Sequence, residues 1–199
     1  FENLIEPFPV EEPSRPPATL PAFCWHYSKG IWPYLAIITV LGIAIALLEI
    51  TIFGFVGSIV EWLSNAEREN FLEREGATLF WMGFVVILVV PVLAALWALL
   101  MHQTVYGNYP MIIRWQAHRY MLGQSMQFYQ DEFAGRVATK VMQAALGVRE
   151  TVIKILDVFV YVTVYFVGAL VLVAAFDPWL MVPFLFWVVL YATACWWFL

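Results

Sequence analysis

The acidic residue Glu49 lies near the middle of an otherwise apolar run, Tyr34–Val60, where a carboxylate could do chemistry. A charged side chain at the centre of a lipid bilayer costs about 2.5–3.5 kcal/mol, so it must face other helices or water. Phe53 lies one helical turn later on the same face. Two interpretations of Glu49 stay open: it lines a substrate pathway with Phe53 beside it, or it takes part in a hydrogen bond between helices.

A second group of polar side chains lies where another apolar run begins at Val158. Lys154 and Asp157 are three residues apart, a spacing that brings side chains together on a helix. We therefore expect a local ion pair at the edge of the membrane. Tyr161 and Tyr165 continue this side of the helix and are further candidates for a substrate pathway.

Metal-binding and nucleophilic patterns are missing from the sequence. His26, His102 and His118 are scattered, without the His-x-x-x-His spacing that puts two ligands on one helical face. The two cysteines, Cys24 and Cys195, are too few for a disulfide framework. We predict no catalytic residue, no metal site and no cofactor site in this chain, which argues against an intramembrane enzyme.

The composition indicates that helices in lipid position these residues. Of the 199 residues, 63% are hydrophobic and 13% are charged. In a typical soluble domain about 45–50% of the residues are apolar and about 25% are charged. A soluble enzyme, a disordered tail and, with a net charge of −5, a nucleic-acid binder are therefore excluded. A helix needs about 20 apolar residues to cross a bilayer. Four continuous stretches meet this requirement: Tyr34–Val60, Thr78–Met101, Val158–Phe176 and Pro178–Leu199.

These runs predict an all-α polytopic membrane protein with four transmembrane helices, because a β-barrel would show alternating segments instead. We expect spans over residues 32–62, 78–126, 136–176 and 178–199, with a loop over 125–135. These elements form a transmembrane domain over residues 22–199.

The first 21 residues are expected to be a proline-rich cytoplasmic lead-in, extended and poorly ordered. The aromatic stretch over 22–30 is predicted to be a helix that lies on the membrane surface. The chain begins with Phe1, and we expect it to be a piece of a longer protein.

Basic residues predict the orientation, because cytoplasmic loops carry an excess of Lys and Arg. Residues 61–77 include two basic and five acidic side chains, whereas residues 102–154 include six basic and three acidic ones. We therefore place the N-terminus and the long middle segment in the cytoplasm.

The segment between the second and third runs carries a helical pattern of its own. From Val137, apolar residues recur with the period of a helix, and charged residues fill the opposite side. A helix from Arg136 to Phe176 would be about 60 Å long at 1.5 Å per residue. The hydrocarbon core is about 30 Å thick. This helix is therefore expected to project far into the cytoplasm.

The second span is expected to extend in the same way, with a kink at Pro91 and a bend at residues 107–110. In the return helix, Gly147 is the expected weak point. Phe128 and Tyr129 lie at the tip between the two extensions. Exposed aromatic side chains at such a tip need a cover, and we expect another protein to supply it.

The stretch FYQDEFAGRVATKVMQAALGVRE (Phe128–Glu150) resembles the first intracellular loop of ATP-binding-cassette (ABC) exporters with the type I exporter fold. The surface helix, the acidic outer loop and the short turn Asp177–Leu180 also fall where that family has them. The resemblance implies a six-helix transmembrane domain followed by an ATPase domain, of which this chain holds four spans. The chain has no Gly-x-x-x-x-Gly-Lys-Ser/Thr loop, so ATP and Mg²⁺ belong to the domain outside it.

The resemblance also implies roles for individual residues. Those expected to couple the membrane domain to the ATPase are Ser125, Gln127, Phe128, Tyr129, Gln130, Asp131 and Arg136. In the family such a segment rests in a groove of the ATPase domain and passes its closure to the spans. For Arg136, an ordinary charge at a helix start is an equal alternative.

The function implied by the resemblance is export by alternating access, driven by ATP in a homodimer in the bacterial inner membrane. The ATPase would be fused to the chain or carried by a partner. The alternative is a non-transporting membrane subunit whose cytoplasmic hairpin docks a soluble protein.

Overall fold

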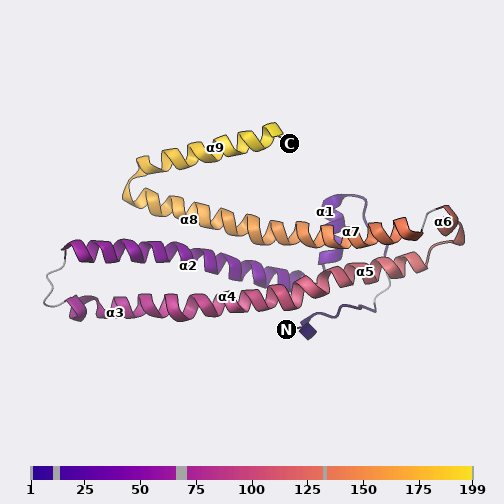
Figure 1. Ribbon diagram of the computed structural model, residues 1–199, viewed down its shortest axis with the longest axis horizontal. Coiled ribbons are helices and arrows are strands. Elements are labelled where there is room, and N and C mark those ends of the chain that lie inside the picture. The colour runs from indigo at the N-terminus through magenta and orange to yellow at the C-terminus, as the bar shows by residue number, and fades with distance from the viewer. Residues whose placement is uncertain (1, 11–13, 66–70, 132–133, 199) are drawn as a thin grey trace. The chain divides into compact units, whose positions relative to one another are not determined.

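The structure is a computed structural model that describes residues 2–10, 14–65, 71–131 and 134–198 (Figure 1). Over these residues every regular element is a helix. Four helical stretches are long and apolar enough to cross a membrane: Trp32–Leu63, Arg74–Leu122, Gly135–Ala175 and Pro178–Phe198. The prediction of an all-α polytopic membrane protein is confirmed.

The helices follow one another with few interruptions. A short helix, α1 (Leu20–Ser28), precedes the first long helix, α2 (Trp32–Asn65). The second long stretch comprises α3 (Phe71–Phe84), η3 (Val85–Val89), α4 (Val90–Leu99), η4 (Leu100–Tyr106) and α5 (Gly107–Leu122). The short α6 (Met126–Asp131) leads to the third stretch, which comprises α7 (Ala134–Ile153), η5 (Lys154–Phe159) and α8 (Val160–Phe176). The turn η6 (Pro178–Leu180) and α9 (Met181–Phe198) complete the described chain.

The chain packs as two compact units, of which the first comprises Phe1–Gly42 and Val92–Val160. Its core joins α1, the start of α2, η4, α5 and α7. The largest fully buried side chains in this core include Tyr109, Ile31 and Ile113. Tyr109 shares a buried hydrogen bond of 2.6 Å with Ser28, so α5 is held to α1. Figure 1 shows α5 and α7 side by side, joined by α6.

The N-terminal segment, residues 2–10, differs from the expected disordered lead-in because it packs on this first unit. Ile5 is buried in the core, and the ring of Phe8 meets that of Trp115 edge to face at 5.3 Å. Trp115 Nε1 donates to the carbonyl of Pro9 at 3.0 Å, and Tyr34 donates to the carbonyl of Leu4 at 2.7 Å. A proline lacks a backbone N–H but keeps its carbonyl as a hydrogen-bond acceptor. Side-chain donors can therefore still hold a proline-rich segment in place.

Three segments of the long helices have the wider π-helical turn: η3, η4 and η5. Two of them come just before a proline, Pro91 or Pro110, whose ring crowds the carbonyl four residues earlier. The expected kink and bend therefore take the form of locally widened turns. Gly147 lies within the regular helix α7, and the irregular turn of the third stretch begins seven residues later at Lys154. The helix is therefore not interrupted at Gly147, and the energetic cost of this glycine relative to alanine stays a prediction.

The second unit comprises Ile43–Pro91 and Tyr161–Leu199. Within it α2 approaches α8 closely, because Gly168 has no side chain: a Cβ there would collide with Cδ1 of Ile50. One turn farther along, a Cβ on Gly54 would lie 3.9 Å from Cδ1 of Leu172, which is an ordinary contact distance. Small residues of this kind let two helices in lipid approach closely.

Candidate functional site

The tip of the α5–α7 hairpin is built by a glycine turn and a short helix. The helix α5 ends at Leu122, and the N–H of Gly123 donates to the carbonyl of Tyr120 at 3.3 Å. Ser125 then precedes α6, and its carbonyl accepts from the N–H of Phe128 at 3.1 Å. Ser125 Oγ accepts from the same N–H at 3.4 Å, so this side chain caps the start of α6.

The two aromatic residues of the tip are partly exposed and held in place. Phe128 and Tyr129 are 37% and 38% exposed, and their rings meet edge to face at 5.4 Å. Tyr129 donates its hydroxyl hydrogen to the carbonyl of Met121 at 2.6 Å, which ties α6 back to α5. The hydroxyl of Tyr129 is therefore held against α5, while its ring contacts that of Phe128.

The other residues predicted to couple to an ATPase lie around this pair. Ser125, Gln127 and Gln130 are exposed on or beside α6, and Arg136 is exposed near the start of α7. Asp131 is the last residue of α6. The predicted loop over 125–135 also includes Glu132 and Phe133, which lie outside the described residues.

The amphipathic pattern of the return helix is confirmed, because the apolar face of α7 packs on α5. Ala145, Val148 and Val152 are buried, and Ala145 rather than the exposed Ala144 faces the core. Arg149 places its guanidinium 5.1 Å from the ring centroid of Tyr106, which adds a cation–π contact. Both arms of the hairpin are therefore helices that pack on each other.

The substrate-pathway candidates meet in the second unit, where α2 and α8 are in contact. The carboxylate of Glu49 accepts a hydrogen bond from the hydroxyl of Tyr161, and both side chains are half-buried. The ring of Tyr161 stacks on that of Tyr165, with centroids 6.1 Å apart and planes 15° apart. Phe53 is 56% exposed and does not join this group.

Tyr165 also lines an apolar cavity of about 640 Å³ between α8 and α9. The other lining side chains include Phe166, Phe184 and Trp187, and the size is typical of a pocket for a small molecule. A series of groups therefore leads from the Glu49 carboxylate through two tyrosines to an aromatic cavity.

The predicted ion pair between Lys154 and Asp157 is wrong. Lys154 Nζ lies 3.9 Å from a carboxylate oxygen of Glu150, one turn earlier. Asp157 instead lies near Gly42 of α2 and near Trp97. A Cβ added to Gly42 would be 4.0 Å from Asp157 Oδ1 and 3.8 Å from Trp97 Nε1. The widened turn of η5 redirects the side chains of this stretch, so the regular three-residue spacing does not apply.

Metal ligands do not gather in the described part of the chain, where no three His, Cys, Asp or Glu side chains form a group able to hold an ion. Cys24 and Cys195 are both free thiols. Burial raises the pKa of the Cys24 thiol above its ordinary value, which keeps it protonated and unreactive at neutral pH.

Comparison with known proteins gives one informative match. The chain is 38% identical over 192 residues to a protein of Haemophilus influenzae (strain Rd) described as an uncharacterized ABC transporter ATP-binding protein. The chain is related to an ABC transporter component. The match covers 96% of this chain and 31% of that relative, so the chain spans about a third of its relative's length. No protein-family model matches the chain, and no solved structure matches it significantly.

Sequence reasoning about this ABC-related chain missed two features of the first unit. One is the docked N-terminal segment, and the other is a cavity of about 690 Å³ between that segment, α1 and α5. The apolar side chains of Leu4, Ile5 and Phe8 near the prolines were the available signal for docking. The proline content is typical of extended chains and points to the opposite conclusion.

Proposed function

We propose that this chain is the first part of the transmembrane domain of an ABC exporter, and that α6 is its coupling helix. The observation that carries the proposal is the α5–α7 hairpin, which extends the second and third apolar runs and ends in the paired rings of Phe128 and Tyr129. The sequence match to an ABC transporter component supports the same conclusion.

The hairpin could pass a movement of the ATPase domain to the membrane-spanning helices. A movement of α6 would be passed to α5 by the hydrogen bond of Tyr129 to Met121, and to α7 through the packed face around Ala145. Since α7 continues through η5 into α8, the movement reaches the helix that carries Tyr161. Rigid-body transmission of this kind is one of the established routes of conformational coupling.

Glu49, Tyr161 and Tyr165 are proposed to line the substrate pathway, with Phe53 left on an exposed face. A carboxylate bonded to a phenol, next to an aromatic cavity, fits an amphipathic compound that carries a positive charge. The chain would act as a homodimer in the bacterial inner membrane, with its N-terminus in the cytoplasm.

ATP and Mg²⁺ are assigned to a nucleotide-binding domain outside this chain. The 199 residues include no phosphate-binding loop, so the side chains present do not fit the nucleotide. This chain is proposed to receive the closure of that domain at α6 and to convert it into movement of the spans.

The decisive experiment removes the exposed ring at the tip. Phe128→Ala in the full-length protein should reduce substrate-stimulated ATPase activity and transport by about tenfold or more, because a buried aromatic anchor contributes about 2 kcal/mol or more to an interface. Activity is measured on purified protein in nanodiscs, alongside thermal unfolding to show that the variant is folded.

Met142→Ala is the matched control, since Met142 is also an exposed apolar side chain but lies on α7 away from the tip. It should leave the activity unchanged. Unchanged activity in Phe128→Ala would contradict the coupling role. Equal loss in both variants would favour a general effect on the hairpin.

A further inference from the structure

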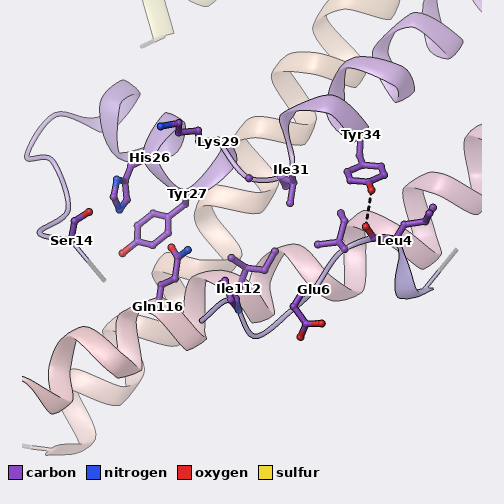
Figure 2. Close-up of a pocket in the computed structure, with 13 residues that line it drawn as sticks. Leu4, Glu6, Ser14, His26, Tyr27, Lys29, Ile31, Tyr34, Ile112 and Gln116 are labelled. Carbon is purple, nitrogen blue, oxygen red and sulfur yellow. Dashed lines mark hydrogen bonds between the residues drawn. The ribbon is translucent and has the colours of Figure 1, made fainter. Parts of the chain in front are cut away.

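The cavity of about 690 Å³ in the first unit has two different sides (Figure 2). His26, Tyr27, Ser14 and Gln116 gather at one side, whereas Leu4 and Tyr34 lie toward the other. Ile31 and Ile112 lie between the two sides. The cavity therefore gathers several polar side chains at one end, whereas its middle and other end combine apolar side chains with the carboxylate of Glu6 and the ring of Tyr34.

The polar end carries one fixed positive charge and several hydrogen-bond donors. Lys29 supplies an ammonium group, and the imidazole of His26 supplies a ring N–H. Neither side chain forms a hydrogen bond or ion pair with another described residue. Burial raises the pKa of the Tyr27 phenol, so its hydroxyl stays protonated and able to donate. This combination favours an anionic group such as a phosphate.

A carboxylate, Glu6, also lines the cavity and is the main objection to an anion. Its Oε1 lies 3.3 Å from the N–H of Phe8, which donates to it and turns part of its charge toward the N-terminal segment. The ammonium group of Lys29 offsets this one negative charge, and the donors of His26, Tyr27 and Gln116 remain for an anionic group.

The position of the cavity in the chain favours a lipid over a soluble anion. Lys29 lies three residues before α2 begins and five before the apolar run that starts at Tyr34. Trp25 and Trp32 flank it, with rings in edge-to-face contact at 5.1 Å and exposed fractions of 52% and 41%. Exposed tryptophans at the start of a span mark the depth of the lipid head groups.

We propose that this cavity binds a membrane phospholipid, with its phosphate between Lys29 and His26 and an acyl chain along Ile31 and Ile112. The N-terminal segment forms one wall, held by the hydrogen bonds of Tyr34 and Trp115 to its carbonyls. Bound lipid would thus join the N-terminal segment, α1 and α5 into one body.

Native mass spectrometry of the delipidated full-length protein, titrated with phosphatidylglycerol or phosphatidylethanolamine, tests the proposal. The double variant His26→Ala/Lys29→Ala should weaken the tightest-bound lipid by about tenfold, which corresponds to about 1.4 kcal/mol. Both lipids should bind, because the phosphate is common to them. Gln116→Trp keeps Lys29 and His26 but fills the cavity from α5, and it should weaken binding of the same lipid.

Lys140→Ala is the matched control, because Lys140 is an exposed lysine on α7 outside the cavity. It should leave lipid binding unchanged. Unchanged affinity in both cavity variants would overturn the proposal, as would equal weakening by Lys140→Ala. Displacement of the lipid by millimolar inorganic phosphate would assign the site to a soluble anion and would overturn it too.

Discussion

At the scale of single residues, the hydrogen bond from Tyr161 to Glu49 bears on both interpretations of this half-buried carboxylate. The bond joins α2 and α8, so Glu49 does have an interhelical partner. The stacked Tyr165 and the cavity beside it also leave room for a pathway. The geometry is therefore compatible with both roles, and substitutions must separate them.

The variants Tyr161→Phe and Glu49→Gln provide this separation. Tyr161→Phe removes the hydroxyl that donates to Glu49 and should lower the free energy of unfolding by about 0.6–1.7 kcal/mol, the usual contribution of such a bond in lipid. Glu49→Gln keeps an acceptor oxygen but removes the charge. If Glu49 binds a cationic substrate, Glu49→Gln should abolish substrate stimulation of the ATPase while Tyr161→Phe retains it.

Thermal unfolding and ATPase assays on the purified full-length protein measure both effects. A Glu49→Gln protein with normal substrate stimulation would show that the carboxylate has only a structural role.

At the scale of elements, each of the two units is held together internally, one by a close helix contact and the other by side chains that donate to the backbone. The contact of α2 with α8 depends on the missing side chain of Gly168. The contact of the N-terminal segment with α5 depends on Trp115 and Arg119, whose side chains donate to the carbonyls of Pro9 and Val10. Each feature makes a separate prediction.

Gly168→Leu should separate α2 from α8, because the new side chain would occupy the space that Ile50 fills. We expect a loss of about 1–3 kcal/mol, the usual cost of overpacking. Adding Ile50→Ala to this variant should restore part of the lost stability, because the smaller side chain leaves room for the leucine. Unfolding of the single and double variants gives the coupling energy, and strictly additive effects would show that the two residues do not touch.

Replacement by phenylalanine should have different effects on stability at two tryptophans. Trp115→Phe loses the 3.0 Å bond to Pro9 and should destabilise the first unit by about 1 kcal/mol. Trp97 Nε1 is buried and has no hydrogen-bond partner among the described residues, so Trp97→Phe should be neutral or stabilising. Limited proteolysis at Arg15 should become faster only in Trp115→Phe. Equal behaviour of the two variants would contradict the docking of the N-terminal segment.

At the scale of the whole molecule, the orientation rests on the charge difference between residues 61–77 and 102–154. Cysteines placed at Asn65 and Thr139, with Cys24 and Cys195 replaced, should react with an impermeant maleimide from opposite sides of the membrane. We expect Asn65→Cys to react from outside and Thr139→Cys from the cytoplasm. Reaction of both from one side would contradict the orientation and the position of α6 at a cytoplasmic motor.

The sequence by itself determined the helical class, the four membrane-length stretches and the buried face of α7. Each of these depends on the composition or period of one continuous segment, which the sequence states directly. The exposed aromatic pair at the tip followed from the same reasoning, since Phe128 and Tyr129 lie between two such segments.

Only the tertiary structure decided which side chains meet across segments. It placed Tyr161 against Glu49, paired Lys154 with Glu150 rather than Asp157, and docked Ile5 on the core formed with α5. Periodicity shows which face of a helix is buried, but the partner of a side chain depends on helix approach and on widened turns such as η5. Those are set by the packing of residues far apart in the chain, which no local pattern contains.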